Sequence, residues 1–338
     1  MATLLYAYPR RSSFIDIDRA ALAAEHEILD WEQPGRVTDP RRLWPRLRRA
    51  DAVVAWWASW HSFVCVTLAW LTGKPVLLIV GGFDVASVPE VGFGYQQGGL
   101  AKWASRWIIA RATRLVTNSH YSREEIARNI GPRTAARVEV IHHGIPDPFG
   151  SLPEESARER TALTVGGISS LTLEQKGQRP FVDAAALAPD VRWVHAGEWI
   201  DEEAAEQLRG RAGDNVELRG WVEQSELEGL YARASVYVQA SWHEGFGMAI
   251  AEAMLAGCVP VVRDAGAMPE VVGDAGVLIS GSEPAQIAEG VRRALEAGLE
   301  GRRRARERVL REFPLATRGE RLRAAVDRVL GERGQSGA

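Results

Sequence analysis

The chain has 338 residues, 46% of them hydrophobic and 25% charged, and a formal net charge of −3. This length exceeds one ordinary hydrophobic core and is typical of two domains, and the balanced composition excludes a largely disordered chain. The charge is uneven, because residues 1–148 carry +4 and eight of the 12 tryptophans, whereas the remainder carries −7. A basic, Trp-rich half suits an anionic acceptor or a lipid surface, or simply a solvated basic face over a tryptophan-containing core.

Cys65 and Cys258 lie in apolar runs without metal-ligand spacing. This is typical of buried thiols in a reducing compartment, so we expect a cytoplasmic protein. Residues 52–73 are long and apolar enough to suggest a membrane span, but they include His61 and several Ser and Thr residues. We interpret this run as a buried strand, a turn and a helix. Peripheral contact with the inner membrane face through the N-terminal half stays open.

Short apolar runs recur along the chain with helix-like segments between them. In the first half we expect strands at Thr3–Tyr8, Ala52–Trp56, Pro75–Val80, Leu115–Asn118 and Val138–Ile141. In the second half we expect strands at Thr161–Gly166, Val191–Ala196, Val216–Leu218, Ser235–Gln239, Val259–Val262 and Gly276–Ile279. This alternation predicts an α/β protein with two doubly wound, Rossmann-like domains, each built on a parallel sheet with helices on both faces.

The domain boundary is expected in Ile145–Ser156, where three prolines and a glycine interrupt both patterns. We therefore assign residues 1–148 to an N-terminal domain, 149–330 to a C-terminal domain and 331–338 to a flexible tail. The last helix-like segment, Leu315–Leu330, has no strand after it and can pack on any apolar face. Open parallel sheets bind ligands beyond the carboxyl ends of their strands, so we expect a site in a cleft between two facing domains.

The most informative segment runs from Ser235 to Val262 and reads SVYVQASWHEGFGMAIAEAMLAGCVPVV. A strand is expected to end near Ala240, and a helix to begin near Gly247 or Met248. Glycines at a helix entrance let a ligand approach the backbone, and the N–H groups of the first helical turn suit a phosphate.

Glu244 precedes this turn and Glu252 lies one to two turns inside the helix. A carboxylate accepts hydrogen bonds from two hydroxyl groups well, so sugar or ribose hydroxyls are natural partners. Either residue alone is more typical of a solvated loop charge or a helix-dipole residue than of a ligand site. Together with the glycines and the strand before them, they indicate a ligand site.

The segment EGFGMAIAE resembles the glutamate–seven-residue–glutamate motif of retaining glycosyltransferases of family 4, which have the GT-B fold. The segments around it, VELRGWVEQSELEGLYARASVYVQAS and AMLAGCVPVVRDAGAMPEVVGDAG, are similar to the same family. So are VTNSHYSREEI and HHGIPDPF in the first half. The similarity covers most of the chain and is densest from Val216 to Gly276.

On the matching positions, the resemblance implies a hexosyltransferase whose nucleotide-sugar donor, UDP- or GDP-type, is a substrate and not a cofactor. Glu252 would bind the ribose, Glu244 the donor hexose, and the Gly245–Ala249 backbone the diphosphate. Gly220–Glu223 would pack against the base. The implied donor-binding residues are Gly166, Gly167, Lys176, Trp221, Val222, Glu244, Gly245, Phe246, Gly247, Met248, Ala249 and Glu252.

Lys176 precedes a predicted helix in the loop after the first strand of the second half. A leaving nucleoside diphosphate needs positive charge where its own negative charge develops, and Lys176 is placed to supply it. The family usually has an arginine as well, and Gly167 stands at the matching position. Arg179 or Arg263 is a candidate substitute; otherwise the site relies on backbone amides.

In the first half, Gly82 and Asp84 follow a buried strand. Asp84 is expected to contact donor or acceptor hydroxyls in a catalytic role, although a turn-forming Asp fits equally well. His120 also follows a strand, and His142 and His143 are weaker candidates near the boundary. Where the family has a glycine-rich first loop, this chain has Arg10, Arg11, Ser12 and Ser13. The acceptor-side candidates are Arg10, Arg11, Gly82 and His120.

Asp16–Ile17–Asp18 spells the D-x-D pattern that holds a divalent metal in the other main glycosyltransferase fold. We interpret it as the acidic start of a helix, and we expect metal-independent catalysis. A GT-B epimerase or phosphorylase is the enzymatic alternative, and a nucleotide-binding protein without turnover is the non-enzymatic one. A nicotinamide oxidoreductase is disfavoured, because no G-x-G-x-x-G follows a predicted strand.

Overall fold

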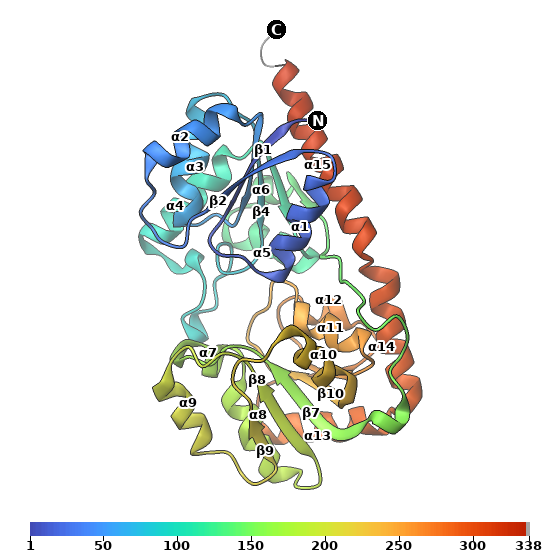
Figure 1. Cartoon of the computed structure of the whole chain (residues 1–338). Coiled ribbons are helices and arrows are strands. Elements are labelled where there is room, and N and C mark those ends of the chain that lie inside the picture. The colour runs from blue at the N-terminus through green and yellow to red at the C-terminus, as the bar shows by residue number, and fades with distance from the viewer. Residues whose placement is uncertain (336–338) are drawn as a thin grey trace. The chain divides into compact units, whose positions relative to one another are not determined.

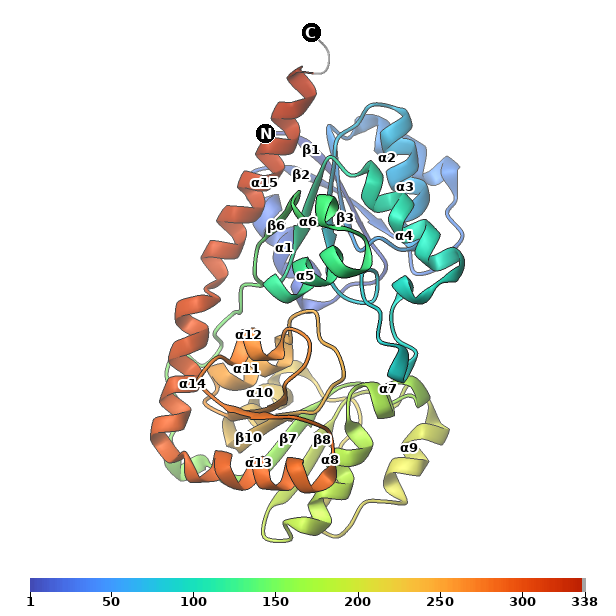
Figure 2. The same cartoon turned by 180° about the vertical axis from the view of Figure 1, so that it is seen from behind.

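The computed structural model describes residues 1–335, which form two compact units (Figures 1 and 2). Unit 1 comprises residues 1–144 and the C-terminal segment from Leu315 onward, and unit 2 comprises Ile145–Pro314. The chain therefore leaves unit 1 at the predicted boundary. It returns to unit 1 after Pro314, which the sequence did not indicate.

Unit 1 is built on one six-stranded sheet in which every pairing is parallel, with the order β2-β1-β3-β4-β5-β6. Its strands are β1 (Thr3–Tyr8), β2 (Glu27–Glu32), β3 (Ala52–Trp56), β4 (Val76–Val80), β5 (Arg114–Thr117) and β6 (Val138–Val140). All five predicted strands are confirmed, and β2 was missed. The strand order reverses between β1 and β3, and the carboxyl ends of strands at such a point are where open sheets bind ligands.

Helices cover both faces of this sheet. They are α1 (Ser13–Ala23), α2 (Pro40–Arg49), α3 (Trp60–Leu71), α4 (Gly99–Arg111), α5 (His120–Asn129), α6 (Pro132–Ala135) and α15 (Leu315–Gln335). Buried residues of α1 and α15 share one core cluster, and those of α2 to α6 share the cluster on the opposite face. The apolar run 52–73 forms β3 and α3, as predicted, and no helix within residues 1–335 is both long and apolar enough to cross a membrane.

Helix α15 corrects the predicted domain assignment, which placed residues up to 330 in the C-terminal domain. Its buried residues Leu322, Ala325, Val326 and Val329 pack with residues of β1, β3 and β4. Arg318 is fully buried and forms a two-pronged ion pair with Asp18 of α1, with Nη2 2.6 Å from Oδ2 and Nε 2.9 Å from Oδ1. Helix α15 continues to Gln335, past residue 331 where the tail was predicted to begin, and residues 336–338 lie outside the described part of the chain.

Unit 2 has a second parallel sheet of six strands, in the order β12-β11-β10-β7-β8-β9. They are β7 (Glu159–Val165), β8 (Arg192–Ala196), β9 (Val216–Leu218), β10 (Ala234–Gln239), β11 (Val259–Arg263) and β12 (Val277–Ile279), as predicted to within two residues at each end. The strand order reverses between β7 and β10. The segments that follow these two strands therefore lie at the expected ligand position.

The helices of unit 2 are α7 (Ser170–Gln175), α8 (Gln178–Ala184), α9 (Glu202–Arg209), α10 (Gln224–Arg233), α11 (Met248–Leu255), α12 (Met268–Val272), α13 (Pro284–Glu296) and α14 (Gly298–Glu312). Helices α8, α9 and α13 bury residues on one face of the sheet, and α11, α12 and α14 on the other. The core is thus complete on both sides, and the carboxyl edge of the sheet is where polar side chains gather.

Candidate functional site

The loop between β10 and α11 forms the centre of the candidate site in unit 2. Helix α11 begins at Met248, as predicted, with Gly247 as its N-cap in a left-handed conformation (φ 109°). A Cβ atom added at Gly247 would lie 2.7 Å from Cδ1 of Ile250, so the tight entry depends on glycine. Gly247 accepts from the amides of Ile250 and Ala251. The amides of Met248 and Ala249 open the helix without intrahelical acceptors and suit an anion.

Lys176 lies in the segment that follows β7, the strand beside β10 where the strand order reverses, and its side chain contacts this loop. It is the C-cap of α7 and is followed directly by Gly177, the N-cap of α8. The Trp242 amide donates to the carbonyl oxygen of Gln175 (2.8 Å), which fixes the two loops side by side. Lys176 Nζ then donates to Glu244 Oε1 at 2.7 Å. The structure therefore brings together two predicted site residues that are far apart in the sequence.

Polar residues at the end of β10 orient the Glu244 carboxylate. Ser241 Oγ donates to Glu244 Oε1 (2.9 Å), and Gln239 Nε2 donates to the same oxygen (3.2 Å). The Tyr237 hydroxyl in turn donates to Gln239 Oε1 (2.7 Å). No residue in 1–335 donates a hydrogen bond to Oε2 of Glu244, so this oxygen can accept from a ligand. We did not predict Gln239 or Ser241; the available signal was their polarity at the end of a buried strand.

Glu252 lies on α11, half-buried, with its Oε2 3.3 Å from the hydroxyl group of Tyr231. Burial raises the pKa of this carboxyl above its ordinary value, the Tyr231 hydrogen bond opposes that rise, and nearby Glu228 adds to it. Among the described residues, Glu252 has no cationic partner within salt-bridge distance. A desolvated carboxylate with one protein donor is suited to hydroxyl groups of a ligand.

The loops after β7 and β9 contain the other predicted donor residues, and the loop after β8 lies against them. Gly166 and Gly167 follow β7, and a Cβ at Gly167 would lie 2.6 Å from the end of the Ile200 side chain. Gly220 has a left-handed conformation, and a Cβ atom added there would lie 3.3 Å from the Trp199 ring. Trp221 beside it is 65% exposed, whereas Val222 packs on the core. Exposed aromatic rings at this edge can stack on a planar ligand.

The two candidate substitutes for the missing arginine differ in their surroundings. Arg179 is exposed and pairs with Glu174, a neighbour on α7. Arg263 ends β11, and its guanidinium lies 3.6 Å from the centroid of the Trp242 ring. Trp242 belongs to the same loop as Glu244. The structure therefore favours Arg263 as the second cation near this loop.

Phe246 does not present its side chain to a ligand. Its ring is buried in the core and lies edge-on against Phe313, with the ring centroids 5.1 Å apart. Met248 and Ala249 are likewise packed against this core cluster. The side chains of this segment therefore belong to the core, and donor binding through its backbone stays a prediction.

In unit 1, Asp84 corrects a prediction. Its side chain is fully buried, and its two oxygens accept from the amides of Ala58 (3.0 Å) and Gly81 (3.2 Å). Burial raises its pKa to about 6, against the opposing effect of these amides. Asp84 therefore fixes the turn after β4, the alternative left open above, and is not placed to touch a substrate. Gly82, beside it, keeps partial exposure.

Arg10 and Arg11 follow β1, at the point where the strand order of unit 1 reverses. Both are exposed, and Arg11 pairs with Asp16 at 3.3 Å. Across the reversal, Trp57 follows β3 with φ 57°, unusual for a bulky residue. Such strained residues concentrate at functional sites, so Trp57 joins the acceptor-side candidates. The sequence carried no signal for its conformation.

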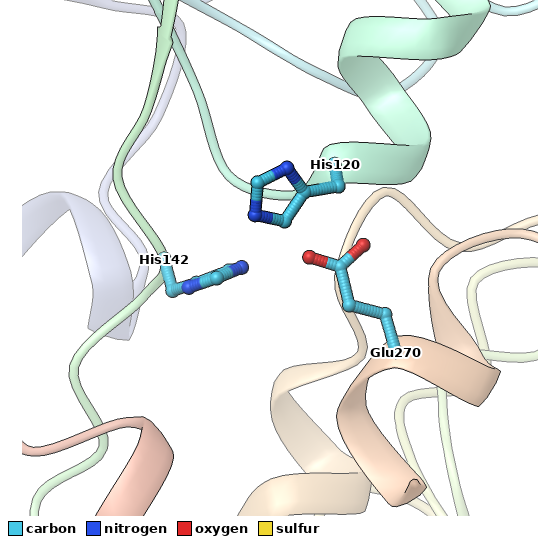
Figure 3. A group of neighbouring side chains, drawn as sticks. All are labelled: His120, His142 and Glu270. Atoms are coloured by element: carbon cyan, nitrogen blue, oxygen red, sulfur yellow. The ribbon is translucent and has the colours of Figure 1, made fainter.

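Three histidines lie near the carboxyl ends of β5, β6 and β3. His120 begins α5, and its ring lies 5.5 Å from that of His142, centroid to centroid (Figure 3). Glu270, also drawn there, belongs to α12 of unit 2. His143 is buried and stacked on Trp56, so its burial lowers its pKa well below the ordinary value. His143 therefore serves the core, whereas His120 stays an exposed candidate.

The D-x-D pattern lies on α1. Asp18 is enclosed in its ion pair with Arg318, and Asp16 is exposed beside Arg11. The pair with Arg318 occupies both oxygens of Asp18, so this motif lacks one of the two carboxylates that a metal would need.

Two family models match two successive segments of the chain. Residues 9–147 match the family described as Glycosyltransferase Family 4, and residues 159–297 match Glycosyl transferases group 1. The chain is 28% identical over 276 residues to glycogen synthase of Mycobacterium tuberculosis, covering 73% of this chain and only 64% of that enzyme. It is 28% identical over 295 residues to alpha-maltose-1-phosphate synthase of Mycolicibacterium smegmatis, covering 76% and 74% of the two chains.

Solved structures share the fold along nearly the whole chain. The Anabaena protein Alr3699/HepE, solved in complex with UDP and glucose, superposes with a TM-score of 0.77 at 16% identity, covering 97% of this chain and 100% of that one. Sucrose-phosphate synthase from Thermosynechococcus elongatus superposes with a TM-score of 0.79 at 14% identity, covering 98% and 100%. At these identities the likeness concerns the fold.

Proposed function

Because this chain belongs to glycosyltransferase family 4 and has the GT-B fold, we propose that it transfers a hexose from a UDP- or GDP-type sugar to an acceptor, with retention of anomeric configuration. The observation that carries this proposal is the Lys176–Glu244 pair beside the N-terminus of α11. It puts a cation, a carboxylate and free helix amides at the strand-order reversal of unit 2.

In the proposed complex, the diphosphate lies against the amides of Met248 and Ala249 and accepts from Lys176. Glu252 accepts the ribose hydroxyls, and Oε2 of Glu244 accepts from the hexose. Two relatives support a sugar-nucleotide donor: Alr3699/HepE was solved with UDP-glucose, and a GDP-mannose-dependent alpha-mannosyltransferase of Mycolicibacterium smegmatis is 28% identical over 221 residues. Trp199 and Trp221 offer exposed rings to the base.

During transfer, the bond between the anomeric carbon and the diphosphate oxygen breaks, the acceptor oxygen bonds to that carbon, and the proton of the acceptor hydroxyl passes to the departing diphosphate. Negative charge grows on the departing diphosphate, where Lys176 and the helix amides stabilise it. We propose that these groups suffice without a divalent metal. Arg263 is the proposed second cation, which acts from the Trp242 side of the loop.

We place the acceptor on unit 1, at the carboxyl ends of β1 and β3. Arg10 and Arg11 suit an anionic group, and Trp57 offers an aromatic surface at the reversal point. Gly82 and His120 border neighbouring strands. The chemical class of the acceptor, glycan, lipid-linked or small molecule, is the target of the test below.

The test is a donor screen by thermal shift, followed by turnover with candidate acceptors. A sugar nucleotide that binds only the native state raises its melting temperature. Acceptor-dependent release of nucleoside diphosphate, with a product of unchanged anomeric configuration by NMR, is the expected result. Binding without release for every acceptor would instead support a nucleotide-binding protein without turnover, for which the glycine at position 167 is the motivation.

A further inference from the structure

The outer faces of α2, α3 and α4 in unit 1 form a strongly basic surface, on which Arg49 pairs with Glu27 of β2. Helix α2 contains five arginines, and α4 contains Lys102, Arg106 and Arg111. None of the three helices has an Asp or Glu residue. All three bury their opposite sides in one core cluster on the same face of the sheet, so their outer sides belong to one surface (Figure 1).

Aromatic side chains line the same surface. We call it the Trp–Arg face and define its aromatic residues as Trp44, Trp60, Phe63, Trp70, Trp103 and Trp107. Along the seam between α3 and α4, Phe63 lies 5.6 Å from Trp103 and 6.4 Å from Trp107, and Trp70 lies 6.4 Å from Trp107, between ring centroids. The rings therefore form a continuous ladder along both helices.

Much of this ladder is open to solvent. Trp103 is 51% exposed and Trp70 48%, and two aliphatic neighbours, Leu100 and Leu71, are 75% and 64% exposed. The Arg111 guanidinium lies 3.0 Å from the Trp107 ring centroid and 4.6 Å from that of Trp70. A positive charge is therefore placed between two of the rings. Exposed tryptophan and leucine side chains with arginines between them match the layers of a bilayer interface, where rings sit at the headgroups and aliphatic groups below them.

We propose that the Trp–Arg face docks on an anionic lipid surface. Charge complementarity selects this occupant, because the three helices carry eight cations and no Asp or Glu residue, and Glu27 of β2 pairs with one of these cations, Arg49. A second copy of the chain, related by a twofold axis, would place this basic surface against itself. A polyanion without an apolar layer leaves Leu71 and Leu100 without partners. Only an anionic bilayer matches both the charges and the aliphatic groups.

The test is sedimentation of the intact protein with vesicles of phosphatidylcholine alone or mixed with phosphatidylglycerol. We expect binding to the mixed vesicles, weakened by high salt, and little binding to phosphatidylcholine alone. A blue shift of tryptophan emission should accompany binding. These results need no variant. Equal binding to both vesicle types, no binding, or binding only to a soluble polyanion such as heparin would overturn the proposal.

Paired variants localise the surface. Arg41→Glu with Arg42→Glu should weaken binding at least about twentyfold, since each cation near an anionic surface contributes about fivefold. Both residues are exposed in the first turn of α2. Because the helix dipole favours negative charge there, the new Glu side chains should leave folding intact. Arg303→Glu with Arg304→Glu, exposed on α14 of unit 2, is the charge-matched control and should bind nearly as wild type.

Leu100→Ser with Trp103→Ser should weaken vesicle binding and reduce the emission shift, whereas Leu310→Ser on α14 should do neither. If the control variants lose vesicle binding as strongly as those of the Trp–Arg face, the docking surface lies elsewhere. If the wild type instead self-associates and the Trp–Arg variants abolish that association without affecting vesicle binding, the occupant is a second copy and the proposal is wrong.

Discussion

The Nζ atom of Lys176 lies 2.7 Å from Oε1 of Glu244, although 68 residues separate the two in the sequence. The backbone bond between Gln175 and Trp242 holds their loops together. The cation proposed for the diphosphate and the carboxylate proposed for the hexose are therefore presented as one unit. Both partners are largely shielded, with side chains 30% and 15% exposed, so the site is preorganised before a donor arrives.

Lys176→Ala should lower kcat by about 10²–10³, as when one preorganised donor is lost from an oxyanion site. The reason is that the contact strengthens as charge builds on the leaving phosphate, which affects kcat and not only KM. Lys176→Arg should recover part of the loss, since its planar donors are arranged differently. Steady-state kinetics on both variants provide the measurement, and near-normal kcat in the alanine variant would show that other groups hold the diphosphate.

Activity should persist in excess EDTA, because Lys176 and the α11 amides supply the electrostatic stabilisation that a metal gives elsewhere. The measurement is the initial rate of nucleotide release before and after chelation. A complete loss that magnesium or manganese restores would refute metal independence. The metal would then need ligands other than Asp18, whose carboxylate is bound by Arg318.

Asp18→Ala should lower the free energy of unfolding by about 3–5 kcal/mol, because it leaves the Arg318 guanidinium buried without its partner. Asp16→Ala is the matched control: Asp16 is exposed two residues away, and its loss should change stability by less than about 0.5 kcal/mol. Denaturant titration monitored by circular dichroism measures both. Equal stability of the two variants would mean that α15 does not depend on this pair.

His195 should make the protein less stable in mild acid. Burial in β8 lowers its pKa to about 4, so the unfolded chain binds a proton below pH 6.5 that the folded chain does not. The stability contribution is complete well above the unfolded pKa and falls by about 2 kcal/mol between pH 7.5 and 5. His195→Leu should shrink the stability difference between pH 7.5 and pH 5 by that amount. If the stability difference between the two pH values is the same in the variant and the wild type, His195 takes up its proton in the folded protein as it does in the unfolded chain.

The sequence predicted both sheets well because most strands are buried on both faces and appear as short apolar runs. Strand β2 escaped because it is an edge strand, EILDWE, with three acidic residues in six positions, two of which pair with Arg19 and Arg49. Helix α15 was recognised as a helix but assigned to the wrong unit. Its apolar stripe indicates a buried side, yet nothing in the stripe identifies the sheet that it covers.

The sequence indicated which residues belong to the candidate site, but it did not indicate which of them contact one another. Glu244, Lys176 and the glycines at α11 were found from their motif and strand context. Their direct ion pair was not, because it depends on how the β7 and β10 loops meet. Gly247→Val, an obvious probe of backbone approach from sequence alone, is unsuitable, since φ 109° and the 2.7 Å approach to Ile250 would strain the fold itself.

The most direct test of the donor site is calorimetric titration of Glu252→Gln with UDP and GDP. Removing a desolvated charge should leave the melting temperature equal or higher, while the loss of a charged hydrogen-bond acceptor for the ribose should weaken binding of the preferred nucleotide at least about tenfold. Glu300→Gln, exposed on α14, is the control and should bind as wild type. A Glu252→Gln variant that is fully folded and binds the nucleotide with wild-type affinity would contradict the assignment of the donor site to α11.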